Sequence, residues 1–214
     1  MKLDKTVIPK LTTELMKPLP GEDAQYRMAP SYRPRLSYNE IQLLHPKLSG
    51  VMLLLYEKDG ELNIVFTQRK LYEGVHSGQM SFPGGKKDET DVDLTQTALR
   101  ETKEEIGMGE EKIEIIGKLT ELYIPPSNFL VYPSIGFAQN NFSFIPQQNE
   151  VEKVVEIPLD FFLNERNINL HAIIKLFNGT TVQAPAYIFN EHIIWGATAI
   201  MLSEFTFVLR EALK

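Results

Sequence analysis

Two strand patterns followed by a glycine-rich loop and a helix pattern constrain the fold of this chain more than any other feature. Residues 51–57 and 62–69 are apolar stretches typical of strands, and the Lys-Asp-Gly segment at residues 58–60 favours a tight hairpin turn between them. The glycine-rich loop follows at residues 76–85. Residues 93–106 then have the apolar spacing of an amphipathic helix. This order predicts a mixed α/β or α+β domain.

The rest of the chain has further strand and helix patterns. A short amphipathic helix is expected within residues 1–17, and two prolines end it. Residues 18–48 are expected to form an ordered arm that docks through its tyrosines, Tyr26, Tyr32 and Tyr38. Further strands are expected at residues 113–122, 132–138, 151–157, 170–177 and 186–195, before a final amphipathic helix. We therefore predict an N-terminal arm, residues 1–48, packed on a single domain, residues 49–214.

The composition is that of an ordinary globular protein. Of the 214 residues, 43% are hydrophobic and 23% are charged, which excludes a chain that is disordered throughout. The formal net charge of -6 disfavours a broad nucleic-acid surface. The longest apolar run, residues 51–56, is far too short to span a membrane, and the N-terminus lacks the apolar centre of a signal peptide. Because the chain has no cysteine, we predict a cytoplasmic protein. The net charge and the short apolar runs predict that it binds neither nucleic acid nor membranes.

Three glutamates crowd one side of the predicted helix. Glu101, Glu104 and Glu105 fall within an arc of about 100°, where like charges repel one another. Glu104 and Glu105 also lie in the last turn, where the helix dipole disfavours negative charge. Hard divalent cations prefer several carboxylate oxygens, so Mg²⁺ or Mn²⁺ is the expected partner of this cluster. Arg100 is placed to pair with Glu104 one turn later and to fix the direction of that carboxylate.

A solvated acidic face is the alternative interpretation of this helix, with Arg100 and Lys103 in ordinary ion pairs. The Gly84-Gly85 pair before the helix, preceded by Pro83, favours a functional site. Glycine lets a backbone approach a metal or a phosphate closely. A solvated acidic face does not require such an approach.

The segment that contains these acids resembles the signature of the Nudix hydrolase family, G-x5-E-x7-R-E-x2-E-E-x-G followed by an apolar residue. The matching residues are Gly85, Arg100, Glu101, Glu104, Glu105, Gly107 and Met108. Asp91 stands in place of the first glutamate, and eight residues separate it from Arg100. In this departure the chain resembles the coenzyme A diphosphatase branch of the family, which tolerates an aspartate and the longer spacing. The upstream signature of that branch is matched by Thr67, Arg69, His76, Gly78, Gln79, Ser81, Phe82, Pro83, Gly84 and Gly85.

The resemblance implies a Nudix fold, a mixed β-sheet sandwiched between α-helices, and a metal-dependent hydrolysis of a diphosphate by activated water. It implies that Mg²⁺ or Mn²⁺ is held by the carbonyl oxygen of Gly84 and by the three carboxylates, Glu101, Glu104 and Glu105. Arg100 is implied to orient the carboxylates.

The resemblance also implies candidates for the general base and for substrate contacts. Glu101 is the first candidate for the base, and Glu150 is the second, either as a base or as an extra metal ligand. The alternative for Glu150 is an exposed loop acid. The expected substrate contacts are Arg69, His76, Phe82 and Ser127. A structural role is the alternative for three of them: an ion pair for Arg69, a loop hydrogen bond for His76 and core packing for Phe82.

Coenzyme A is the substrate that the resemblance favours, with 3′,5′-ADP and 4′-phosphopantetheine as products. Glu73 and Gly74 stand where members of the branch usually have Leu-Arg, so the chain lacks an arginine that is a candidate for a phosphate contact. The rival within the class is an ADP-ribose or other nucleoside-diphosphate-sugar diphosphatase, and the rival outside it is a non-catalytic nucleotide-sensing module. The final helix is apolar enough to pack on its own sheet or on a second copy in a homodimer, and its pattern leaves both open.

Overall fold

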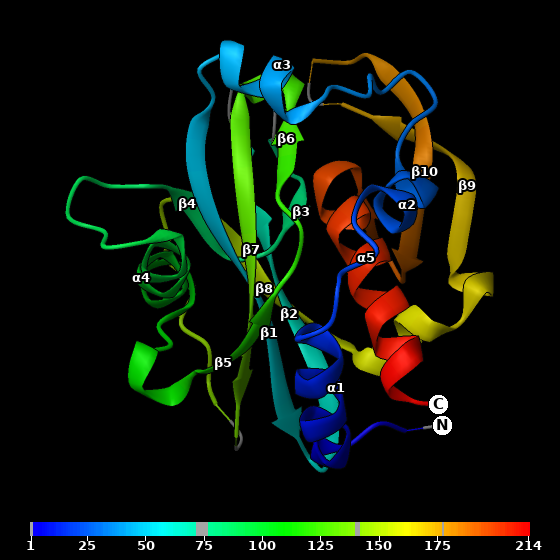
Figure 1. Cartoon of the computed structure of the whole chain (residues 1–214). Helices are drawn as coiled ribbons and strands as arrows, with labels where there is room; N and C mark the ends of the chain where they lie inside the picture. Colours follow the sequence, from blue (N-terminus) through cyan, green and yellow to red (C-terminus); the bar gives the residue numbers. More distant parts are fainter. Residues whose placement is uncertain (1, 72–76, 140–141, 177) are drawn as a thin grey trace.

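A mixed β-sheet forms the centre of the computed structural model, which describes residues 2–71, 77–139, 142–176 and 178–214 (Figure 1). Within these residues the sheet consists of β1 (Lys47–Lys58), β2 (Glu61–Arg69), β3 (Met80–Ser81), β4 (Gly84–Lys86), β5 (Glu114–Lys118), β6 (Leu122–Ile124), β7 (Phe129–Ala138) and β8 (Val151–Pro158). Its main path runs β3-β2-β1-β7-β5, with β4 also paired to β1, β6 to β7 and β8 to β2. The β1–β7 pair is parallel and the others are antiparallel, so the sheet is mixed, as predicted.

The predicted hairpin of β1 and β2 is confirmed. Lys58 pairs with Glu61, so the turn consists of Asp59 and Gly60 alone, and both have positive φ angles, 52° and 78°. Two such residues form the turn type whose twist matches that of two antiparallel strands. Residues 52–56 of β1 are all buried, because β1 lies in the middle of the sheet and is covered on both faces (Figure 1).

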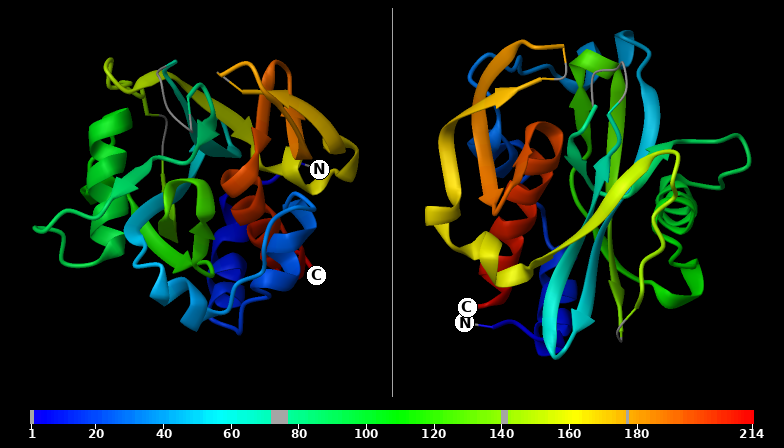
Figure 2. Two further views of the ribbon diagram at one scale, coloured as in Figure 1. Left: turned by 90° about the horizontal axis from the view of Figure 1, so that it is seen from above. Right: turned by 180° about the vertical axis from the view of Figure 1, so that it is seen from behind.

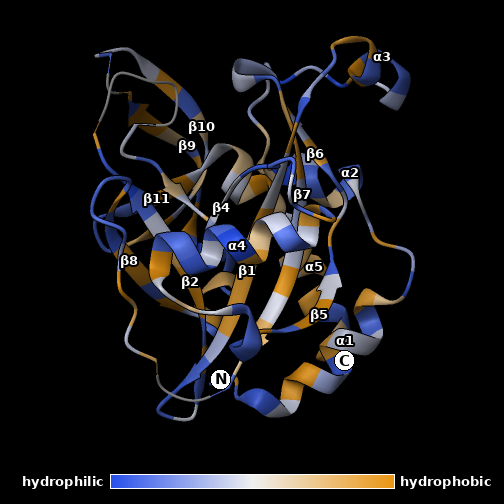
Figure 3. Ribbon diagram, turned by 90° about the vertical axis from the view of Figure 1, so that its left-hand side faces the viewer, coloured by the Kyte–Doolittle hydropathy of each residue, from blue (hydrophilic) through white to orange (hydrophobic). Residues whose placement is uncertain are grey.

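Helix α4 (Leu94–Ile106) covers one face of the central sheet, and its outer side is mainly hydrophilic (Figure 3). Asp93 caps its start by accepting a hydrogen bond from the backbone N–H of Gln96 at 2.8 Å, and Gly107 ends it in the left-handed conformation. The predicted helix is therefore confirmed at both ends. Gly50 of β1 lets the helix approach the sheet, because a Cβ atom there would lie 2.1 Å from the carbonyl oxygen of Leu94.

Helix α5 (Gly196–Ala212) lies between the central sheet and a second sheet (Figure 2). The second sheet has the order β11-β10-β9, made of β9 (Ile168–Lys175), β10 (Thr181–Phe189) and β11 (His192–Trp195). The prediction of a single strand over residues 186–195 is wrong, because this segment contains the end of β10, a turn and β11. Asn190, with a φ angle of 51°, lies in the turn.

The expected amphipathic character of the final helix is also wrong. Most residues of α5 are buried, because the two sheets and the arm surround it. Burial within its own chain is one of the two alternatives that the sequence leaves open for this helix, and a homodimer stays a prediction.

Shorter elements complete the chain. The strand expected at residues 113–122 is interrupted, since β5 ends at Lys118 and β6 begins at Leu122. Single turns of 3-10 helix are η1 (Lys5–Val7), η2 (Tyr26–Met28), η3 (Glu110–Lys112), η4 (Pro125–Ser127), η5 (Leu159–Leu163) and η6 (Glu165–Asn167). Among the described residues, the helices are all too short or too polar to cross a membrane.

The N-terminal arm packs on α5, and of its three tyrosines only Tyr26 is half-buried. It contains the predicted first helix, α1 (Ile8–Leu15), and two short helices that the sequence does not predict, α2 (Glu22–Gln25) and α3 (Tyr38–Leu43). Tyr32 and Tyr38 are 64% and 57% exposed, so docking through them is wrong. The arm instead buries its aliphatic residues Leu3, Val7, Ile8, Leu11, Leu15, Ala24 and Met28. The division of the chain at residue 48 stays a prediction.

A buried carboxylate fastens this arm to α5. Glu204 is completely buried, and four groups donate hydrogen bonds to it. The donors are the side chain of Gln25 at 2.9 Å, the backbone N–H of Gly21 at 3.2 Å, and the hydroxyl and backbone N–H of Thr120 at 2.6 and 3.3 Å. These donors compensate the cost of burying the charge.

Candidate active site

A cavity of about 900 Å³ opens between α4, the central sheet and the start of α5. It brings together most of the residues predicted to act on a metal or a substrate, namely Arg69, Phe82, Gly84, Glu101, Glu104, Glu105, Ser127 and Glu150. Arg100 is bonded to two of these carboxylates. His76 lies outside the described residues, as do Glu73 and Gly74.

Glu105 is the most buried carboxylate of the cavity, with 4% of its surface exposed. Burial is the largest cause that raises the pKa of Glu105 to about 8; the charges of Glu101 and Glu150 act in the same direction, and the positive charge of Arg69 opposes them. The hydroxyl of Thr67 donates a hydrogen bond to Oε2 of Glu105 at 3.4 Å. A cation in the cavity would therefore stabilise the ionised form of this group.

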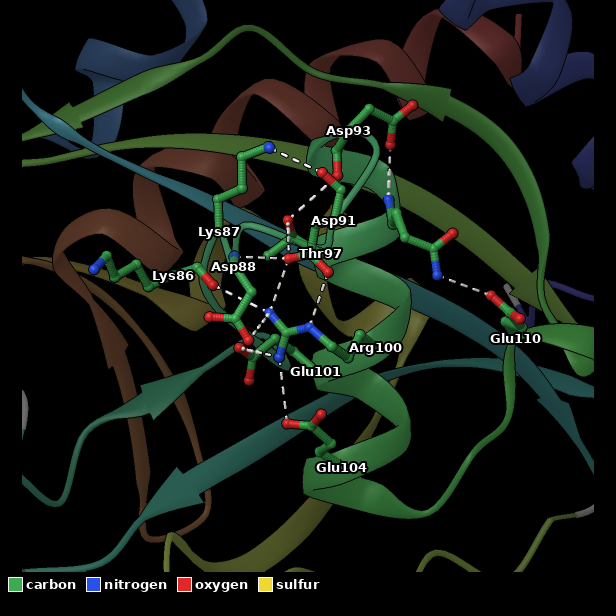
Figure 4. Close-up of polar contacts among 11 residues, drawn as sticks. Lys86, Lys87, Asp88, Asp91, Asp93, Thr97, Arg100, Glu101, Glu104 and Glu110 are labelled. Carbon is green, nitrogen blue, oxygen red and sulfur yellow. Dashed lines mark hydrogen bonds and ion pairs between the residues drawn. The ribbon is translucent and has the colours of Figure 1, made fainter.

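Glu101 and Glu104 lie on the same side of α4 and share one partner (Figure 4). The Nη1 atom of Arg100 lies 2.9 Å from Oε1 of Glu101 and 3.3 Å from Oε2 of Glu104. The predicted pairing of Arg100 with Glu104 is thus confirmed. Glu101 is half-buried, and burial raises its pKa while the bond to Arg100 opposes that shift. The side chain of Glu104 is 56% exposed.

Asp91, the residue that departs from the family signature, holds Arg100 in place (Figure 4). Its two oxygens accept hydrogen bonds from Nε and Nη2 of Arg100, both at 3.0 Å. Asp91 is buried and also accepts hydrogen bonds from the hydroxyl of Thr97 and the backbone N–H of Asp88, both at 2.9 Å. The bond from Arg100 is the largest cause that holds the pKa of Asp91 well below its usual range. Asp91 therefore fixes the guanidinium that bonds Glu101 and Glu104.

The loop that carries Glu150 is attached to the C-terminal end of α4. The backbone N–H groups of Ile145 and Gln147 donate to the carbonyl oxygens of Ile106 and Glu105, at 3.0 and 2.9 Å. The side-chain oxygen of Gln147 then accepts a hydrogen bond from the backbone N–H of Glu150 at 2.9 Å. Although Glu150 is exposed, this attachment keeps it on the same cavity as the carboxylates of α4.

The glycine pair before α4 leaves the room that the carboxylates need. A Cβ atom at Gly85 would lie 2.3 Å from Oε1 of Glu101, and one at Gly84 would lie 2.5 Å from the carbonyl oxygen of Gly50. A side chain at either position would displace the carboxylate or the strand.

The donors of the cavity fit a divalent cation by their chemistry. Carboxylate and backbone carbonyl oxygens are the donors that Mg²⁺ and Mn²⁺ prefer, and the buried Glu105 lies among like charges. In the part of the chain that the structure describes, no group of three acidic or histidine side chains is arranged to hold one ion. The fit therefore rests on the type of donor and on the shared cavity.

The predicted substrate contacts have different surroundings. Arg69 ends β2, and its positive charge acts on Glu105. Phe82 is buried in the core with its ring stacked on Phe66 at a centroid distance of 5.2 Å, so little of its surface remains for a substrate. The hydroxyl of Ser127 is buried and has no hydrogen-bond partner among the described residues.

The cavity also has wall residues that the sequence interpretation misses. They are Tyr32 and Arg33 of the arm, Gln147 of the loop before β8, and Trp195 before α5. For Arg33 a signal exists, since Arg27, Arg33 and Arg35 form a basic stretch in a chain of negative net charge. For Trp195 the sequence favours a core position, because apolar residues and glycine surround it.

The architecture is that of a known class of α+β proteins. The MutT protein from Methanosarcina mazei Go1 superposes with a TM-score of 0.51 at 17% identity, over 78% of this chain and 96% of that protein. This likeness shows the fold. Residues 46–172 match the model of the NUDIX domain, which is more than half of the chain. The chain therefore belongs to the Nudix family.

Two curated proteins are similar to this chain in sequence. The chain is 34% identical over 168 residues to Nudix hydrolase 15, mitochondrial, from Arabidopsis thaliana, across 73% of this chain and 56% of that protein. It is 36% identical over 134 residues to the peroxisomal coenzyme A diphosphatase NUDT7 of Mus musculus, across 61% of this chain and 56% of that protein. The chain spans little more than half the length of these relatives.

Proposed function

We propose that this protein hydrolyses a diphosphate bond in a nucleotide-linked metabolite with the help of Mg²⁺ or Mn²⁺. One observation carries the proposal: the carboxylates of Glu101, Glu104, Glu105 and Glu150 line a single cavity that is large enough for a nucleotide. An acidic cavity repels a diphosphate unless cations neutralise it, so a cation-dependent reaction explains why the acids are there.

Coenzyme A is the substrate that we propose, with 3′,5′-ADP and 4′-phosphopantetheine as products. The similarity to a protein named as a coenzyme A diphosphatase supports this choice, as does the stretch from Thr67 to Gly85 that resembles that branch. The absence of cysteine supports a reducing compartment such as the cytoplasm. The partner of the protein would be the small nucleotide substrate itself.

The cation would be held by Glu101, Glu104 and Glu105, with the carbonyl oxygen of Gly84 as a backbone ligand. When bound, such a cation lowers the pKa of water and offsets the charge of the leaving phosphate. Arg100 acts as a positioning residue, because its guanidinium bonds both Glu101 and Glu104.

A carboxylate of this chain would take the proton from the attacking water. Glu101 is the first candidate, because its carboxylate lines the cavity and the hydrogen bond from Arg100 fixes its position. Glu150 is the second candidate, since its loop is attached beside Glu105. The proton moves from the water oxygen to a carboxylate oxygen while the new phosphorus–oxygen bond forms and the bond to the bridging oxygen breaks.

The substrate would be bound by residues on the opposite walls of the cavity. Arg69 can take two phosphate oxygens with its planar guanidinium, and the hydroxyl of Ser127 is a donor without a protein acceptor among the described residues. Phe82 would contribute mainly by shaping the wall, because its ring is buried.

Product analysis tests this function directly. The purified protein is incubated with coenzyme A, ADP-ribose and dinucleoside polyphosphates, in Mg²⁺, in Mn²⁺ and in chelator, and the products are separated by chromatography. Release of 3′,5′-ADP from coenzyme A in the metal lanes alone is the expected result. Cleavage of ADP-ribose alone would keep the mechanism and overturn the substrate. No cleavage in any lane would favour a nucleotide-sensing module.

A further inference from the structure

The N-terminal arm reaches the cavity that the proposed function uses. Pro30, Tyr32, Arg33 and Pro34 line the cavity wall, although they lie outside the matched Nudix domain, which begins at residue 46. The arm therefore adds the cation of Arg33 to Arg69 and Lys86, which line the same cavity from within the Nudix domain.

Arg33 is held in this wall by several contacts. One Nη2 hydrogen bond goes to the carbonyl oxygen of Tyr123, and the backbone N–H of Arg33 donates to the carbonyl oxygen of Pro30 at 2.9 Å. The guanidinium lies 6.0 Å from the ring centre of Tyr26, whose hydroxyl donates to the carbonyl oxygen of Pro34 at 2.9 Å. The ring of Tyr26 thus contacts the guanidinium of Arg33 and is hydrogen-bonded to the turn that contains Arg33.

The guanidinium of Arg33 is only partly satisfied by these contacts. Its Nε atom is buried and has no acceptor among the described residues. Ser127 follows the strand that contains Tyr123, and its hydroxyl is likewise buried with no partner in the described part of the chain. Two donors without acceptors in one cavity wall are unfavourable until a ligand supplies oxygen atoms.

We propose that Arg33 and Ser127 bind a second anionic group of the substrate, a phosphate that is separate from the diphosphate that is cleaved. This inference rests on the proposed function and names the part of the substrate that the arm recognises. A phosphate monoester offers three oxygens, which can accept from the Nε and Nη groups of an arginine and from a hydroxyl. The substrate class is then a nucleotide that has a phosphate on its ribose.

This assignment also accounts for the sequence at residues 73–74. Glu73 and Gly74 provide no arginine at the place where members of the resembled branch usually have one. Arg33, which lines the cavity from the arm, is a cation that can bind a phosphate separate from the one that Arg69 contacts.

Calorimetric titration of the whole protein tests the proposal without needing catalysis. The ligands are 3′,5′-ADP, which has the extra ribose phosphate, and 5′-AMP, which lacks it. In Arg33→Gln the Kd for 3′,5′-ADP should rise by about 10-fold or more, and the Kd for 5′-AMP should stay the same. Arg35→Gln is the matched control, because Arg35 stacks on the same Tyr26 ring at 4.3 Å but does not line the cavity. It should bind both ligands as the wild type does.

A structural role for Arg33 would give a different result. Equal weakening of both ligands in Arg33→Gln, no weakening of either, or no preference for 3′,5′-ADP in the wild type would each overturn the proposal. Ser127→Ala, which removes only the hydroxyl, should also weaken 3′,5′-ADP selectively and leave the melting temperature unchanged. Loss of hydrolysis in every lane with selective 3′,5′-ADP binding would overturn the proposed function alone. Hydrolysis of coenzyme A with equal binding of the two ligands would overturn the role of Arg33 alone.

Discussion

Oε2 of Glu204 accepts a hydrogen bond from Nε2 of Gln25 at 2.9 Å, although 179 residues separate the two in sequence. Both side chains are almost completely buried, at 0% and 1% exposure. The pair joins the arm to helix α5, so the position of Arg33 in the cavity depends on a contact between two residues that do not line the cavity.

Glu204→Gln should destabilise the protein by about 1–3 kcal/mol, because one oxygen that accepts hydrogen bonds becomes an NH₂ group that faces other donors. Chemical denaturation measures the difference. Glu211→Gln is the control on the same helix, where the carboxylate pairs with Lys214 at the surface and should contribute less than about 1 kcal/mol. Equal effects of the two substitutions would contradict the importance of the buried contact.

Asp91→Asn should destabilise the protein by about 3 kcal/mol at neutral pH, because it leaves the guanidinium of Arg100 without its bidentate partner. The pKa of Asp91 is lowered by folding, so its contribution is complete above the unfolded pKa of about 3.9 and is lost as the pH falls below that value. The stability difference between wild type and variant should therefore shrink below about pH 4. Denaturation curves at several pH values measure it.

Asp88→Asn is the matched control for that substitution. Asp88 also approaches Arg100, but at 3.9 Å and with a side chain that is 65% exposed. It should change the stability by less than about 1 kcal/mol at every pH. A pH-independent difference for Asp91→Asn would show that the lowered pKa does not contribute to stability.

Glu104→Gln should reduce turnover by about 100-fold or more while the protein stays folded. The substitution removes a proposed ligand charge, yet it also relieves repulsion within the carboxylate cluster, so the free energy of unfolding should not fall. Glu110→Gln is the control, because Glu110 lies just beyond α4 and bonds Gln96 instead of the cavity residues. Unchanged turnover in Glu104→Gln would reject the metal-binding role of this helix.

Arg69→Ala should raise the KM for coenzyme A by about 10-fold, since it removes a charge-assisted contact to a substrate phosphate. Steady-state kinetics measure KM and kcat separately. Lys70→Ala removes a neighbouring cation that does not line the cavity and should leave both constants unchanged. An effect of the same size in both variants would indicate a general loss of positive charge.

The sequence predicts well those elements whose conformation depends on residues that are close together in the chain. The turn at residues 58–60 and the helix that ends before Gly107 are each set by neighbouring residues, and both predictions are confirmed. The contacts of the cavity are long-range. The approach of Arg33 to Tyr123 depends on how the arm folds over α5, which no local pattern encodes.

Strand and helix patterns fail where an element is covered on more than one side. The spacing of apolar residues in the final helix is typical of an amphipathic helix, but the central sheet and the second sheet cover it on two sides. Tyr32 shows the opposite failure, because a residue predicted to be buried is exposed. Its ring lines a cavity wall instead of packing in the core.

The close approach of α4 to β1 sets the tolerance of this site to sequence change. At Gly50 and Gly84 the backbones of the helix and the two strands touch with no side chain between them, so the separation of these layers is fixed by main-chain atoms. A library in which all twenty amino acids are placed at position 50 should return active clones with glycine alone. The geometry of the carboxylates therefore depends on two positions that have no side chain.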